Sequence, residues 1–212
     1  MKNRLKKLMD YIPLIDNYTK LKISGYLLAI AILMSIANID SLACHLCTLA
    51  MFMSFIGDIC LNCMPLNRRP HSLLYTGAVF FMLAHITYAY AYYTLIKATN
   101  KPYFNTGAII SIVFLIVLVS TIIFAIIKSN QKLKASMLLV FGIYVIMISI
   151  NFITICSYSF SFIAISFIGA LSFLISDLII GIETVFKIKS DILRKLVWIF
   201  YPIGQIILLI GR

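Results

Sequence analysis

The stretch FNTGAIISIVFLIVLVSTIIFAII, residues 104–127, carries no charged side chain over 24 consecutive positions. About 20 consecutive apolar residues in a helix cross the hydrocarbon core of a bilayer, so this stretch is long enough to do so. A barrel strand would instead alternate apolar and polar residues over roughly ten positions, and no such alternation is visible. The stretch therefore predicts a transmembrane helix.

The rest of the chain follows the same pattern. Of its 212 residues, 62% are hydrophobic and only 12% are charged, and the mean hydropathy is +1.04. We expect an all-α fold, a polytopic transmembrane helical bundle that forms one domain over residues 21–212, preceded by a basic amphipathic segment at residues 1–20. The expected spans are 21–38, 41–62, 72–96, 104–127, 134–156, 161–183 and 194–211.

The net charge of +11 is unevenly distributed along the chain. Fifteen of the 18 basic residues fall at the N-terminus and in every second loop, and only Lys97, Lys101 and Arg212 fall on the opposite side. This positive-inside bias predicts a cytoplasmic N-terminus in the cell membrane. It favours anionic lipid headgroups as partners of the basic residues and argues against nucleic acid.

Two aspartates, Asp58 and Asp177, lie inside expected spans, each ten residues ahead of a basic loop residue at Arg68 or Lys187. A charged side chain at membrane depth costs about 3 kcal/mol even on lenient scales, and such residues mark function by default. Because the two acids share a level in the membrane, we expect their carboxyl groups to face the same space between helices. They are the candidate catalytic residues.

Helical spacing places other polar residues near the two acids. Ser54, Asp58 and Asn62 share one face of their span, and small residues such as Ala170 and Gly181 accompany Asp177. Interhelical hydrogen bonding alone is the simpler interpretation of any single pair, and His85 alone could be a structural histidine. The candidate orienting residues on the other spans are His85, Tyr88, Tyr144, Tyr201 and Gln205.

The cysteines imitate a zinc site without forming one. The pairs Cys44–Cys47 and Cys60–Cys63 have zinc-ribbon spacing. Both fall on the same expected helix, where sixteen residues at about 1.5 Å each separate them by roughly 24 Å. No HxxxH or HExxH motif occurs either, so we expect neither a metal nor another cofactor.

Four motifs resemble those of the YhhN-like lysoplasmalogenase family. Residues 54–61, SFIGDICL, resemble its S-x-x-G-D-x-x-L, and residues 75–88, YTGAVFFMLAHITY, resemble its next helix, which ends in H-x-x-Y. Residues 169–177, GALSFLISD, resemble its G-A-x-x-F-x-x-S-D, and residues 201–205, YPIGQ, its closing Y-x-x-A-Q. The family usually has eight spans, whereas seven are expected here.

The resemblance implies a hydrolase that cleaves the vinyl-ether bond of lysoplasmalogens, giving a fatty aldehyde and a glycerophospho-alcohol. One protonated aspartic acid would donate a proton to the vinyl carbon, and one ionised carboxylate would stabilise the resulting cation and activate water. Either Asp58 or Asp177 could take either role. The partners implied are the membrane and a lysophospholipid substrate, with Lys22, Arg68 and Arg69 as weaker candidates for its phosphate.

Two other functions fit the same buried acids. A proton-coupled transporter would use them as proton sites, although internal repeats and helices broken by Gly or Pro, which are typical of transporters, are not visible. A lipid-binding membrane protein without catalytic activity is the other alternative. The sequence does not specify an oligomeric state.

Overall fold

The computed structural model describes residues 16–63, 71–128, 135–158, 165–186, 188 and 190–211. These residues form helices and no strands. Each of the seven helices is long and apolar enough to cross a membrane, which indicates a multi-pass membrane protein. The helices are α2 (Asn17–Ala37), α3 (Leu42–Asn62), α4 (His71–Ala98), α5 (Thr106–Lys128), α6 (Ala135–Tyr158), α7 (Ile165–Phe186) and α8 (Asp191–Ile210).

The helices match the seven expected spans, and their starts have ordinary local causes. Asp16, Ser41 and Ser190 each occupy an N-cap, where the side chain accepts a backbone N–H of the first turn. The hydrogen bonds that Asp16 accepts from Thr19 hold the pKa of that exposed carboxyl below its usual value. The expected amphipathic segment over residues 1–20 falls largely outside the described residues, and α2 begins at Asn17.

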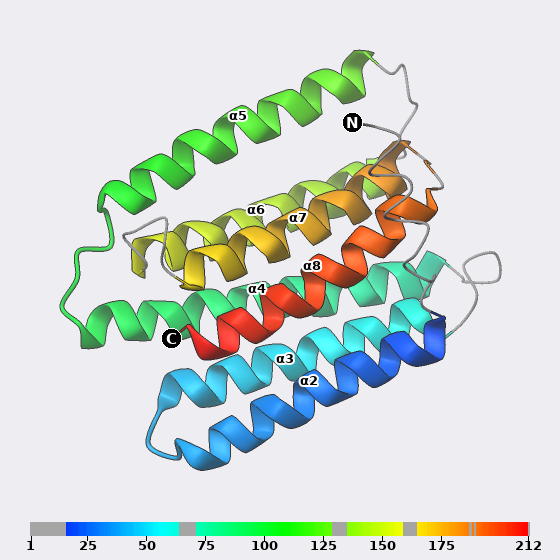
Figure 1. Ribbon diagram of the computed structural model, residues 1–212. Coiled ribbons are helices and arrows are strands. Elements are labelled where there is room, and N and C mark those ends of the chain that lie inside the picture. Colours follow the sequence, from blue (N-terminus) through cyan, green and yellow to red (C-terminus); the bar gives the residue numbers. More distant parts are fainter. Residues whose placement is uncertain are drawn as a thin grey trace, which may run out of the picture.

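Six helices form a closed ring. Following contacts around the bundle, α2 packs on α3, α3 on α4, α4 on α6, α6 on α7, α7 on α8, and α8 returns to α2. The last contact joins the two ends of the described chain, as Figure 1 shows for the blue α2 and the red α8. The ring therefore encloses an interior to which every one of these six helices can contribute a side chain.

Helix α5 lies at the edge of this ring, alongside α6 (Figure 1). It is the most apolar of the seven helices and has the smallest buried share. Most of its large side chains are exposed, whereas Ala108, Ser111 and Leu115 form a buried stripe. In a membrane such an exposed apolar surface faces lipid, so α5 is a lipid-facing helix.

Glycines allow two pairs of helices to approach closely. A Cβ atom on Gly204 of α8 would lie 2.8 Å from the backbone nitrogen of Phe173 and 3.1 Å from the Gly169 oxygen of α7. Between α3 and α4, a Cβ on Gly57 would lie 2.8 Å from the Phe81 ring and 3.3 Å from the Gly77 oxygen. Close backbone approach at small residues is the usual way in which membrane helices associate. Here it packs α7, which carries Asp177, against α8, and α3, which carries Asp58, against α4.

Candidate active site

Asp58 is buried where α2, α3 and α8 meet. Only 4% of the residue is exposed. Its Oδ2 accepts hydrogen bonds from the Ser24 hydroxyl of α2 and, at 2.7 Å, from the Tyr201 hydroxyl of α8. Three helices distant in sequence therefore hold one carboxyl group in a fixed position.

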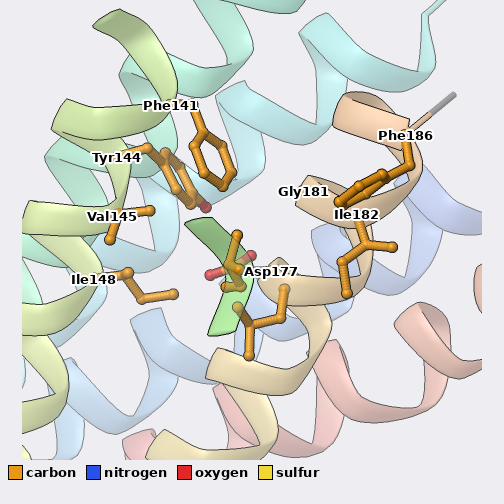
Figure 2. Close-up of a pocket in the computed structure, with 10 residues that line it drawn as sticks. Phe141, Tyr144, Val145, Ile148, Asp177, Gly181, Ile182 and Phe186 are labelled. Carbon is orange, nitrogen blue, oxygen red and sulfur yellow. The ribbon is translucent and has the colours of Figure 1, made fainter. Parts of the chain in front are cut away.

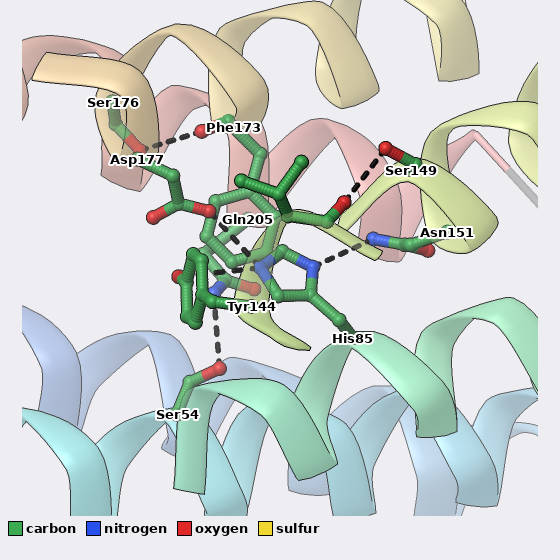
Figure 3. A network of polar contacts seen from close by, with 10 residues as sticks. Ser54, His85, Tyr144, Ser149, Asn151, Phe173, Ser176, Asp177 and Gln205 are labelled. Atoms are coloured by element: carbon green, nitrogen blue, oxygen red, sulfur yellow. Dashed lines mark hydrogen bonds and ion pairs between the residues drawn. The ribbon is translucent and has the colours of Figure 1, made fainter. Parts of the chain in front are cut away.

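Asp177 is buried on the opposite side of the interior, against α4. Its Oδ2 lies 3.0 Å from Nε2 of His85, which is fully buried. The other ring nitrogen of His85, Nδ1, lies 3.0 Å from Nδ2 of Asn151 on α6. The Tyr144 hydroxyl, also on α6, lies 3.5 Å from Nε2. Figure 3 shows His85 between Asp177 and Asn151, with Tyr144 beside the ring.

Phe173 fills the space between these two groups. Its ring centroid lies 4.8 Å from that of His85 and 5.8 Å from that of Tyr201. One partner of each aspartate thus packs on the same ring. The two aspartates and their partners therefore lie in neighbouring parts of one buried region. That their carboxyl groups act as a pair stays a prediction.

A third polar group lies beside the first two. The Tyr88 hydroxyl donates to Oε1 of Gln205, and Nε2 of Gln205 donates to the Ser54 hydroxyl at 3.2 Å. All three residues are fully buried. Tyr88 and Gln205 were expected to orient the aspartates, whereas these hydrogen bonds join α4 to α8 and α8 to α3. Ser54 lies one helical turn before Asp58, so this group still borders the acid.

Asn62 and Lys22 lie apart from the carboxylates. The Asn62 side chain donates to the backbone oxygen of Asp58, 2.9 Å away, and so caps its own helix. Lys22 is exposed and its ammonium lies 4.3 Å from the Tyr18 ring centroid. The neighbouring Lys20 lies 5.6 Å from the Trp198 ring centroid, and its charge acts on Asp58. Arg68 and Arg69 fall outside the described residues.

The sequence did not single out Ser24, Phe173 or Asn151 as site residues. A serine in an apolar span is common, and only packing against α3 gives Ser24 its partner. Phe173 lies four residues before Asp177, on its face of α7, which was a usable signal. The equivalent signal for Asn151 was its position seven residues after Tyr144.

The cysteines of the two pairs differ in burial: Cys44 and Cys47 are buried, Cys60 is partly buried and Cys63 is exposed. Cys44, Cys47 and Cys60 lie on α3 and Cys63 follows its last residue, and all five cysteines of the chain are free. Among the residues that the structure describes, no three His, Cys, Asp or Glu side chains come together as a metal site.

A pocket opens between α6 and α7 and reaches Asp177 (Figure 2). Its cavity volume is only about 30 Å³, and Ile122 of α5 contributes to its wall. Apart from Asp177 and the Tyr144 hydroxyl its lining is apolar, and it includes Phe141, Ile148, Gly181, Ile182 and Phe186. Such a lining suits contact with a hydrocarbon chain.

The comparison with known families agrees with the motifs around the two aspartates. The YhhN family model matches residues 18–212. The chain belongs to the YhhN family. No curated protein and no solved structure matches it. Membership covers every helix of the bundle from its first turn, and it includes all the residues of the candidate site.

Proposed function

We propose that this YhhN-family protein is an integral membrane hydrolase that cleaves the vinyl-ether bond of lysoplasmalogens, with Asp58 and Asp177 as its acid-base pair. The observation that carries the proposal is the pair itself: two buried, hydrogen-bonded carboxyl groups, held by six helices, whose partners His85 and Tyr201 pack on the same Phe173 ring. A role in helix packing alone would not explain two acids in one region. Burying a carboxyl group is costly, and neutral polar side chains could form hydrogen bonds between helices instead.

The reaction consumes one water and proceeds by proton transfers in which the two acids take part. One aspartic acid donates its proton to the vinyl carbon remote from oxygen, which leaves an oxocarbenium cation beside two carboxylates. Water then adds to the cationic carbon while the second carboxylate takes its proton. The C–O bond of the resulting hemiacetal breaks as the hydroxyl proton passes to the departing oxygen, which gives the aldehyde and the glycerophospho-alcohol, and a proton transfer between the acids restores the starting state.

The surroundings of the pair support an amphiphilic substrate. The apolar pocket that ends at Asp177 would hold the alkenyl chain. Lys20, whose charge acts on Asp58, replaces Lys22 as the better candidate for the phosphate. The substrate would thus lie with its ether linkage between the two acids and its chain toward α6 and α7.

We also propose that the N-terminus is cytoplasmic, on the basis of the fifteen basic residues against three. Labelling of introduced cysteines with a membrane-impermeant reagent tests it. Residues 128–134 should react only from the cytoplasmic side, and Asn100→Cys only from the outside. The reverse pattern would overturn the orientation.

Turnover by the purified protein tests the activity. A lysoplasmalogen should yield free aldehyde without added metal, and the matched acyl ester should survive, because ester cleavage needs an activated nucleophile and an oxyanion hole. Asp58→Asn and Asp177→Asn keep size and hydrogen bonding but remove the titratable proton, so each should lower kcat by at least about 100-fold. Asp40→Asn, in an exposed turn, is the matched control.

Near-native turnover in both Asn variants would refute the acid-base pair. If the protein binds the lipid but releases no aldehyde at any pH, the result would instead favour a lipid carrier, a function that the buried acids also permit.

A further inference from the structure

His85 is bonded through both of its ring nitrogens, and the two partners differ in what they can donate. Asp177 on one side is a carboxyl group, and Asn151 on the other is an amide. All three residues are at most 6% exposed, so water does not readily exchange with these bonds. The direction of each bond therefore fixes where the protons lie.

The amide of Asn151 presents its nitrogen to His85. Because an amide N–H only donates, Nδ1 of His85 must be the acceptor and carries no proton. A neutral imidazole then carries its proton on Nε2 and donates it to Oδ2 of Asp177. A carboxyl group accepts such a bond most strongly in its ionised form.

The opposite amide orientation is less favourable. As it stands, Oδ1 of Asn151 is buried and accepts no hydrogen bond within the described residues. Turning the amide over would satisfy that oxygen only with a proton on Nδ1, and would take the amide N–H away from its present partner. Buried N–H groups without partners are rarer than under-satisfied carbonyl oxygens.

Asp58 has a different set of partners. Ser24 and Tyr201 contact it through hydroxyl groups. A hydroxyl can donate to an ionised carboxylate or accept from a protonated one, so both forms of Asp58 can be satisfied. Asp177 differs because His85 donates an N–H to it, and an N–H donor stabilises the ionised carboxylate more than the protonated one.

We propose that Asn151 is a positioning residue that keeps the proton of His85 on Nε2 and so holds Asp177 as the ionised base, which makes Asp58 the acid. The assignment of acid and base rests on the proposed hydrolase function, whereas the proton position on His85 does not. In the reaction the Asp58 proton goes to the vinyl carbon, and Asp177 receives a proton of the attacking water.

The proton position can be measured without any substrate. In protein carrying ¹⁵N-labelled histidine, the His45→Gln/His71→Gln variant leaves His85 as the single histidine, and its two nitrogen shifts report the tautomer. The Nε2–H form is expected at neutral pH. Asn151→Asp should move the proton to Nδ1, because a carboxylate there can only accept. An Nδ1–H form in the otherwise unchanged protein would overturn the proposal.

Kinetics then test the consequence. Asn151→Leu keeps the branched shape but releases Nδ1, so kcat should fall by at least about tenfold with little change in KM, as loss of a tautomer-fixing partner does elsewhere. Ser149→Ala is the control, since Ser149 lies on the same helix and bonds only the Val145 oxygen. An unchanged kcat in Asn151→Leu would contradict the role.

The pH profile of kcat is a further test, because a substitution at a residue with only a structural role would not shift it. The titratable groups facing His85 are Asp177 from α7 and Tyr144 from α6, with Asp58 of α3 within electrostatic reach of Tyr144. Asn151→Asp should shift the profile by adding a carboxyl group to this set, and an unshifted profile would contradict the proposal. If no aldehyde forms in any variant, the proposed function fails while the nitrogen shifts still decide the proton position.

Discussion

Helices α5 and α7 have similar lengths, but α5 lies at the edge of the bundle and α7 is buried within it. Helix α5 is the most apolar and the least buried, whereas α7 is less apolar and the most buried. In a soluble protein the order would be reversed, because water drives apolar side chains inward. In a bilayer the lipid is as apolar as leucine, so small and polar residues identify the protein interior instead. The polar positions of α7 therefore predict the site, and the apolar uniformity of α5 predicts lipid.

The largest difference between the two helices should appear on truncation of one phenylalanine in each. Phe173→Ala on α7 removes a ring that is 1% exposed and packs on His85 and Tyr201, so it should lower the free energy of unfolding by about 3–5 kcal/mol. Phe124→Ala on α5, where the ring is 67% exposed, should change it by no more than about 0.5 kcal/mol. Unfolding of the detergent-solubilised protein measures both. Equal losses would show that α5 packs against protein.

A smaller effect on stability should distinguish a glycine in close contact with a neighbouring helix from a glycine with no atom nearby. Gly204→Ala places a methyl group 2.8 Å from the backbone of α7, which should cost about 1–3 kcal/mol of stability. Gly142→Ala on α6 meets no atom within 4 Å and should stabilise the helix by up to about 1 kcal/mol. Thermal unfolding compares them. If Gly204→Ala left the stability unchanged, α7 and α8 could move apart without a loss of stability.

The smallest effect should come from a single hydroxyl. Tyr201→Phe removes one of the two donors to Asp58 and should lower kcat about tenfold, equivalent to about 1.4 kcal/mol. Tyr26→Phe on α2, at a residue that is 67% exposed, should leave kcat unchanged. Aldehyde release from the lysoplasmalogen measures both variants. A loss of folding rather than of turnover in Tyr201→Phe would assign the hydroxyl a structural role.

Much of the site could be predicted because ionisable residues are rare in apolar spans. Asp58, Asp177 and His85 were identified from their depth, and the structure buries all three in one region. The partners were harder to predict. Asn62 shares a face with Asp58, yet its side chain bonds its own helix, and Lys22 lies on the exposed side of α2 while Lys20 approaches the site. One or two positions along a helix change the direction of a side chain by 100° or more.

The sequence by itself determined the number of apolar helices among the described residues and their positions to within a few residues, because the length of an apolar run decides whether it can cross a bilayer. It also determined which side chains are costly in that setting, and hence the two aspartates. Only the tertiary structure decided that α8 returns to α2, which brings Tyr201 and Ser24 to the same carboxyl oxygen. It alone set Asn151 against His85. The physical reason is that nearly every face of these helices is apolar, so their rotation and order depend on close contacts at glycines and on buried hydrogen bonds between segments distant in sequence.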